Sequence, residues 1–262
     1  MSALLVFTEF IKEENENEQV ERVLTLLRHY YQKYKNECNE NEIYKEPTEA
    51  EIKNRILPED VKKKFCELKK ELIKRDKDKA PFDYLKWKRY LILSFYHFLP
   101  PLRGQEYYSV KICNWKKTKI PDVGNYIDVE NWRLVNRSHK TSRSYGEHII
   151  DIQNNELRNI IKLYIKKSEL QDGDYLLVKD LKGKEPLNTR YFTDTLKCVV
   201  GKSVNELRQM YISNFLDELE KKKHNKEIKQ SVFNKKRKEL AALMGHSIAT
   251  QERRYTKYRG LE

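Results

Sequence analysis

Apolar residues recur at helical spacing along most of the chain. From 16 to 37, and again from about 58 to 72, they fall every three or four positions, as in helices that pack on one face. Residues 83–99 are apolar on nearly every side, which is typical of a buried central helix, and Pro100 and Pro101 end it. Further helices are expected at 154–167, 188–200, 203–220 and near 234–244, with a short helical stretch after Pro47.

Between residues 107 and 152 the pattern changes to that of strands. Polar segment Asn136–Gly146 has the composition of a hairpin loop. Helices, then a small antiparallel sheet, then helices again predict a mostly helical α+β fold. The β-prone runs are Tyr107–Trp115, Tyr126–Val129, Trp132–Asn136 and His148–Ile152.

Charge is distributed unevenly along the 262 residues, whose formal net charge is +13. Residues 1–60 carry 8 Lys/Arg against 14 Asp/Glu, and the remainder carries 45 against 26. We therefore expect an acidic helical N-terminal segment, 1–56, and a basic domain, 57–262. The basic domain predicts a polyanion partner, most commonly nucleic acid, while a merely solubilising lysine-rich surface is the alternative. As an interaction arm, the acidic segment would recruit a protein partner rather than DNA.

The apolar content and the cysteines exclude several classes of protein. A hydrophobic fraction of 39% is too high for a disordered chain, and no run of 18 apolar residues could span a membrane. The cysteines form no CxxC pair and no Cys/His cluster, so no zinc site is expected. Such cysteines indicate a reducing, intracellular compartment. They are Cys38, Cys66, Cys113 and Cys198.

Five residues in separate segments would suit phosphoryl transfer without a metal. Arg103 follows the buried helix, Lys140 lies at the hairpin tip, and Arg208 begins a later helix. His246 precedes Tyr255 by nine residues. Arginine forks grip two phosphate oxygens, a lysine protonates a leaving oxygen, and a tyrosine phenol serves as nucleophile.

Each of these residues also has a plain structural interpretation. Arg103 is spaced to pair with Glu106, and a Gly-His sequence after a helix is often only a C-cap. Tyr255 is one of 17 tyrosines, with Tyr258 close by. Lys140 competes with Lys116, Lys117 and Lys119. Their combination and order decide between the interpretations.

Taken in order, these residues resemble the catalytic domain of tyrosine recombinases, the family of phage, mobile-element and viral integrases. The shared pattern is arginine, hairpin lysine, Leu-Arg, Gly-His and tyrosine, and in that family the last two are usually nine residues apart. The resemblance covers residues 57–262. It is most specific at Leu243–His246 and Tyr255.

The resemblance implies a role for each residue. Arg103 and Arg208 would clamp the scissile phosphate, and His246 would hydrogen-bond one of its non-bridging oxygens. Tyr255 would attack to form a 3′-phosphotyrosyl intermediate, while Lys140 would protonate the departing 5′-oxygen. No metal, ATP or other cofactor is needed, because the covalent linkage conserves the bond energy.

Asn205 is a departure from the family, which has histidine or lysine three residues before this arginine. The amide of an asparagine can donate a hydrogen bond to phosphate, but it neither takes up nor releases a proton at neutral pH. Acid–base catalysis at this position therefore falls to another group. The alternative is that Asn205 caps the helix that carries Arg208.

The 38 residues from Arg208 to His246 exceed the family's usual gap. The surplus, Lys221–Lys238, contains nine Lys/Arg and one acidic residue, which predicts either a solvated loop or phosphate contacts. Only seven residues follow Tyr255, where many recombinases have a helix that docks on a neighbouring protomer. We expect either another mode of assembly or a longer natural chain. The candidate DNA-binding residues are Lys221, Lys222, Lys223, Lys235, Lys236 and Arg237.

Three functions remain open at this point. The resemblance favours a recombinase or integrase that works on double-stranded DNA as a homotetramer. A type IB topoisomerase uses the same chemistry as a monomer, although the Arg103–Glu106 pair and Gly245-His246-Ser247 favour the recombinase. A non-catalytic DNA-binding protein of the same fold is the third alternative.

Overall fold

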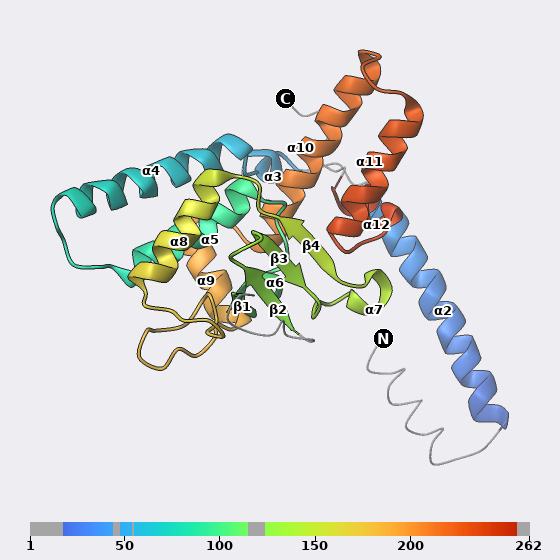
Figure 1. Cartoon of the computed structure of the whole chain (residues 1–262). Coiled ribbons are helices and arrows are strands. Elements are labelled where there is room, and N and C mark those ends of the chain that lie inside the picture. Colours follow the sequence, from blue (N-terminus) through green and yellow to red (C-terminus); the bar gives the residue numbers. More distant parts are fainter. Residues whose placement is uncertain (1–17, 44–47, 54, 115–123, 256–262) are drawn as a thin grey trace.

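A computed structural model describes residues 18–43, 48–53, 55–114 and 124–255, without the side chains of 18–20, 35, 38–43, 51, 144–145 and 252–255. It confirms a mostly helical α+β fold with one small sheet (Figure 1). The helices are α2 (Glu18–Ile43), α3 (Glu49–Lys53), α4 (Pro58–Lys77), α5 (Tyr84–Phe98), α6 (Gly104–Tyr108), α7 (Ser142–Tyr145), α8 (Asn155–Lys167), α9 (Thr189–Val200), α10 (Val204–His224), α11 (Gln230–Leu243) and α12 (Ile248–Tyr255). The strands are β1 (Val110–Cys113), β2 (Asn125–Asp128), β3 (Arg133–Asn136) and β4 (His148–Asp151).

Helix α5 is the centre of the core, as its apolar sequence predicts. The side chain of Asp83 starts the helix by accepting a hydrogen bond from Lys86 N at 3.1 Å. Helices α4, α8 and α9 pack around it, and Phe65 of α4 stacks on Tyr90 with ring centroids 5.2 Å apart. Because α5 is held on so many sides, the segment that follows it begins from a fixed point.

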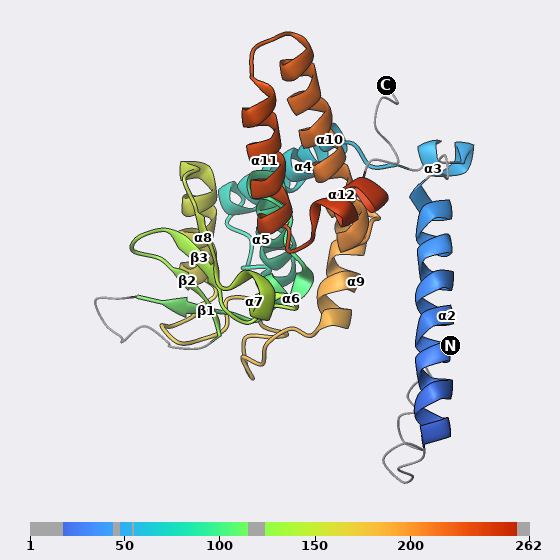
Figure 2. The ribbon, with the colours of Figure 1, turned by 90° about the vertical axis from the view of Figure 1, so that its right-hand side faces the viewer.

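The sheet has the order β1-β2-β3-β4 and lies to one side of the helices (Figure 2). Strands β2, β3 and β4 pair antiparallel, as expected. The expectation of a wholly antiparallel sheet is wrong, because β1 and β2 run parallel with Val110 opposite Asn125. An alternating pattern of apolar residues says nothing about strand direction, so the sequence could not show it.

The basic stretch 221–238 lies in a helical hairpin, so the alternative of a solvated loop holds only for residues 225–229. Helix α10 continues to His224 and α11 already begins at Gln230. Lysine is a good helix former, which explains why the basic residues extend the helices instead of interrupting them. In Figures 1 and 2 the two helices project together from the body.

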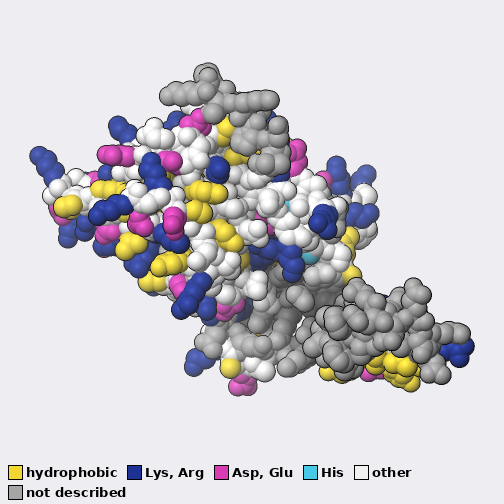
Figure 3. All heavy atoms as spheres, turned by 90° about the horizontal axis from the view of Figure 1, so that it is seen from below, with side chains coloured by type: hydrophobic (Ala, Val, Ile, Leu, Met, Phe, Trp, Pro, Cys, Tyr) yellow, Lys and Arg dark blue, Asp and Glu magenta, His cyan; other side chains and the backbone are white. Residues whose placement is uncertain are grey.

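Helix α2 confirms the predicted N-terminal helix and extends away from the body past α12, which it contacts (Figure 2). Leu24 on this helix is fully buried, whereas the main core begins at Ile56. Seen from below, Lys and Arg side chains are spread over much of the described surface and mixed with acidic ones (Figure 3). Among the residues described, no helix combines the length and apolar character that a bilayer crossing requires.

Candidate active site

Arg103 lies where the chain leaves the buried α5 and enters α6. Its backbone N–H donates to Glu106 Oε2 at 3.1 Å, and its Nη1 lies 3.6 Å from Glu106 Oε1. The expected ion pair is therefore present. The same guanidinium also donates from Nη2 to Gly245 O at 3.1 Å, so Arg103 joins two segments far apart in the sequence.

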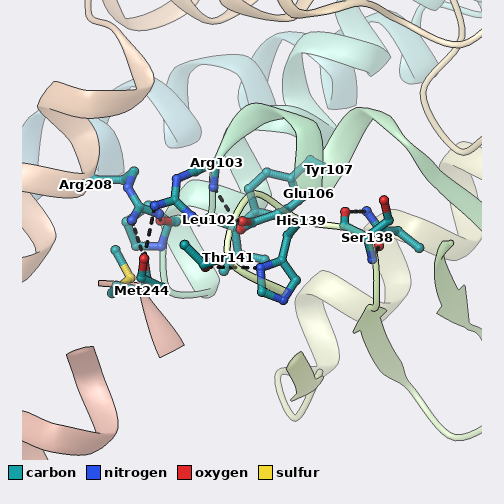
Figure 4. Close-up of polar contacts among 12 residues, drawn as sticks. Leu102, Arg103, Glu106, Tyr107, Ser138, His139, Thr141, Arg208 and Met244 are labelled. Atoms are coloured by element: carbon teal, nitrogen blue, oxygen red, sulfur yellow. Dashed lines mark hydrogen bonds and ion pairs between the residues drawn. The ribbon is translucent and has the colours of Figure 1, made fainter. Parts of the chain in front are cut away.

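Arg208 is only 2% exposed and lies in the second turn of α10. Its Nη1 donates to Pro101 O at 2.9 Å and its Nη2 to Met244 O at 2.6 Å. Figure 4 shows the guanidinium groups of Arg208 and Arg103 side by side. A guanidinium has five N–H donors, so each can hold a carbonyl and still donate to a phosphate.

Arg103 Nη1 is a buried nitrogen with no hydrogen-bond partner among the described residues, apart from its ion pair with Glu106. A buried donor left without an acceptor costs free energy, which an anion bound at this position would recover. Within the described parts of the chain, no group of three or more His, Cys, Asp or Glu side chains is arranged to hold a metal.

His246 lies between α11 and α12 and is 8% exposed. Burial, and then the positive charge of Arg208, lower its pKa to about 4, so the ring is neutral at pH 7. Its Nδ1 lies 3.3 Å from Ser247 O, and because a carbonyl only accepts, Nδ1 carries the hydrogen. The neutral ring in this tautomer has its acceptor nitrogen at Nε2.

Gly245 has a φ of +61°, a conformation that favours glycine. A Cβ at this position would lie 2.7 Å from Thr141 Oγ1 and 3.0 Å from Arg103 Nη1. Residue 245 thus lies where the β3–β4 connection and the first arginine meet. Glycine is therefore required at position 245, because the backbone has a positive φ and no room is left for a Cβ.

Lys140 is exposed, in the turn that precedes α7. In this connection Thr141 approaches the same point at Gly245 as Arg103, and Figure 4 shows His139 next to Thr141. His139 stacks on His148 with ring centroids 4.2 Å apart. The sequence interpretation missed all three. Pairing the two expected strands 132–136 and 148–152 would have indicated that these histidines lie close together. In the structure Asn136 lies opposite His148, and His139 follows Asn136 closely in the sequence.

Asn205 is an exposed residue at the second position of α10. The alternative that it caps this helix is wrong, because Ser203 does so: its side chain accepts from Glu206 N at 3.3 Å. Glu206 Oε2 in return accepts from Ser203 N at 2.7 Å. Asn205 is thus not needed to start α10.

The six candidate DNA-binding residues lie on the α10–α11 hairpin. Two of them pack on one aromatic ring: Lys223 Nζ lies 4.6 Å and Arg237 Cζ 5.6 Å from the centre of Phe233. Lys235 approaches Glu239 at 3.9 Å, an exposed pair worth little. The exposed residues among the six are Lys221, Lys222, Lys235 and Lys236.

Tyr255 is the last residue of α12, nine residues after His246. Its side chain lies outside the described part of the structure, as do residues 256–262. The helix backbone nevertheless continues directly from the turn that both arginines hold. Among the expected site residues, the structure brings Arg103, Arg208 and His246 together, while Lys140 and Asn205 are exposed.

No family model matches this chain, and no curated protein matches its sequence. Among solved structures, the fold is similar to one described as the crystal structure of XerA recombinase, with a TM-score of 0.48 and 16% sequence identity. The match covers 80% of this chain and 58% of the recombinase chain. This chain therefore spans less than two thirds of the protein to which it is similar in fold.

Proposed function

We propose that this protein cuts and rejoins DNA strands by the chemistry of tyrosine recombinases, with Tyr255 as nucleophile. One observation carries the proposal: Arg103 and Arg208, 105 positions apart in the sequence, donate to the consecutive carbonyls of Met244 and Gly245. The turn held in this way leads through His246 into the helix that ends at Tyr255. The arrangement suits a phosphate held between two cations beside a nucleophile.

The two guanidinium groups stabilise the charge that spreads over the phosphate in the transition state. Neutral His246 accepts the phenol proton through Nε2 as the Tyr255 oxygen bonds to phosphorus. Once protonated, its Nε2–H donates to a non-bridging oxygen. Lys140 gives a proton to the departing 5′-oxygen. Asn205 is assigned a hydrogen bond to the phosphate, since helix capping does not require it.

The exposed lysines of the α10–α11 hairpin contact the DNA backbone and bring the scissile phosphate to the arginines. We further propose residues 57–262 as the catalytic domain and 1–56 as a separate acidic segment that binds a protein partner. On DNA the protein acts inside the cell as a tetramer, and the cutting and rejoining of strands need neither a metal nor a nucleotide.

The decisive experiment is a search for a covalent protein–DNA adduct. A library of nicked duplexes with randomised sequence around the nick removes the need to know the target site. We expect wild-type protein to be trapped on a subset of the library and Tyr255→Phe to be trapped on none, with DNA affinity within a few-fold. An adduct that survives Tyr255→Phe but is lost in Tyr258→Phe would assign the nucleophile to Tyr258.

Plasmid relaxation separates the remaining alternatives. A type IB topoisomerase relaxes supercoiled plasmid of any sequence as a monomer, whereas a recombinase requires the recovered site and forms joined duplexes. The Arg103–Glu106 pair, which the structure contains, favours the recombinase. Tight binding without any adduct would indicate a non-catalytic DNA-binding protein.

A further inference from the structure

The β3–β4 connection reaches the candidate site through Thr141 and not through Lys140. A single point at Gly245, where a Cβ would lie, is 2.7 Å from Thr141 Oγ1 and 3.0 Å from Arg103 Nη1. The hydroxyl and the guanidinium therefore face the same piece of backbone. Lys140, one residue earlier, has an exposed side chain.

The Thr141 hydroxyl is held by His139. Thr141 lies at the N-cap position of α7, yet its side chain makes no capping hydrogen bond. Its Oγ1 lies 3.4 Å from His139 Nδ1, while His139 Nε2 lies 2.8 Å from Gly146 O. A carbonyl only accepts, so Nε2 carries the hydrogen and Nδ1 of the neutral ring accepts from Thr141. The hydroxyl thus has a fixed direction (Figure 4).

His139 is itself supported from behind by His148 of β4. The two rings stack at 28° between planes, and they are 6% and 9% exposed. Neither ring nitrogen of His148 has a hydrogen-bond partner among the described residues. Burial, and then the neighbouring His139 and Arg103, lower the pKa of His148, so this ring remains neutral and serves as a packing surface.

Lys140 is therefore flanked in the sequence by two anchored residues, His139 and Thr141. Its backbone is fixed relative to Arg103 and Gly245, and its side chain is free to reach into solvent. For a proton donor this matters, because misplacement by about 1 Å can lower a rate by about 10²-fold.

We propose that Thr141 and His139 are positioning residues that set the point from which Lys140 delivers its proton. The inference rests on the proposed function. In the step concerned, the Tyr255 oxygen bonds to phosphorus and the bond from phosphorus to the 5′-oxygen breaks. The electron pair of that bond stays on the 5′-oxygen, which takes a proton from Lys140 Nζ.

A substrate with sulfur in place of the 5′-bridging oxygen tests this role. A thiolate leaves without a proton, because thiol pKa values are near 8.5 and those of alcohols are far higher. We expect Thr141→Val and His139→Phe to cut the oxygen substrate about 10- to 100-fold more slowly than wild type and the sulfur substrate within a few-fold of it. Lys140→Ala should behave in the same way.

Ser138→Ala is the matched control in the same connection. Ser138 is tied to Asn125 through its backbone N–H, at 2.8 Å, and its backbone carbonyl, at 2.9 Å, so the substitution leaves both bonds in place. This variant should cut both substrates like wild type. Adding Thr141→Val to Lys140→Ala should cause no further loss on the oxygen substrate, since both changes affect one proton transfer.

The outcomes separate the two proposals. If wild type forms no adduct with either substrate, the proposed function fails and this inference fails with it. If wild type cuts both substrates but Thr141→Val and His139→Phe slow them equally, the proposed function stands and the positioning role is wrong. Additive losses in the double variant would also overturn it.

Discussion

Arg103 and Arg208 hold neighbouring peptides of one turn: their Nη2 atoms lie 3.1 Å from Gly245 O and 2.6 Å from Met244 O. A turn fixed at two consecutive carbonyls cannot move without disturbing both arginines. The same turn sets the start of α12. The arginines that we propose as the phosphate clamp therefore also hold the structure that presents His246.

Gly245→Ala should damage the site more than it damages the fold. Gly201, the C-cap of α9, provides the control: its φ is +70°, close to the +61° of Gly245, but a Cβ there meets nothing within 4 Å. Both substitutions should cost about 1 kcal/mol in unfolding free energy from backbone strain. Only Gly245→Ala should slow adduct formation, by about 10-fold or more, because it displaces Arg103 and Thr141. Equal cleavage rates in the two variants would contradict the close approach.

Substitutions of Ser203 and Asn205 should affect different properties, namely stability and DNA cleavage. Ser203→Ala removes the helix cap and should lower the unfolding free energy by about 1 kcal/mol. Asn205→Ala should leave stability nearly unchanged but lower cleavage, by up to ~10² if its amide is one preorganised donor to the phosphate. Asn205→His should keep or raise cleavage, and Asn205→Asp should abolish it by charge repulsion. Normal cleavage by Asn205→Asp would place Asn205 outside the active site.

The exposed hairpin lysines should account for part of the salt dependence of DNA binding. Replacing Lys222 and Lys236 by alanine should reduce the slope of log affinity against log salt by about 2, since each phosphate contact contributes about 0.9. The control replaces two exposed lysines of α4, Lys62 and Lys63, and should leave the slope unchanged, as should removal of residues 1–50. Binding measured from 50 to 300 mM salt gives the comparison. Identical slopes for both pairs would mean that the hairpin faces away from DNA.

The buried His246 should make stability depend on pH. Its folded pKa of about 4 lies below the usual 6.5, so the unfolded chain binds the proton first as pH falls. The stability linked to the neutral ring is complete above pH 6.5 and is lost towards pH 4, on the order of 3 kcal/mol. His246→Gln should flatten this loss in urea titrations at pH 7, 5.5 and 4.5. Part of the slope should remain, because burial also lowers the pKa values of His97 and His148.

The helical pattern predicted most of the fold because helices such as α4 and α8 bury one face and α5 buries nearly all faces. The direction of β1 relative to β2 could not be predicted from the sequence, since the periodicity of apolar residues carries no information on strand direction. The extension of α10 to His224 and the start of α11 at Gln230 were missed for a different reason. The residues concerned are mostly polar, and their helicity depends on good helix formers that look the same in a solvated loop.

The candidate site was accessible from the sequence where residues follow recognisable structure. Arg103 follows a buried helix that ends at two prolines, and Arg208 lies beside Leu207 in a capped helix. The positioning role that we propose for Thr141 depends on its close approach to Gly245, far later in the chain, and no local pattern encodes that contact. Ser203 as the cap of α10 was missed although the signal is local, because Ser203 and Glu206 have the spacing of a capping box.

The ties between the arginines and the Met244–Gly245 turn have a consequence during protein synthesis. Arg103 is made 142 residues before the carbonyl that it binds, and Arg208 is made 36 residues before its own. Because the ribosome delivers the chain from the N-terminus, a nascent chain can already fold around α5 while the candidate site still lacks the Met244–Gly245 turn. The candidate site is thus completed among the last contacts to form, and a translation product interrupted before Met244 would have both arginines without the turn that they hold.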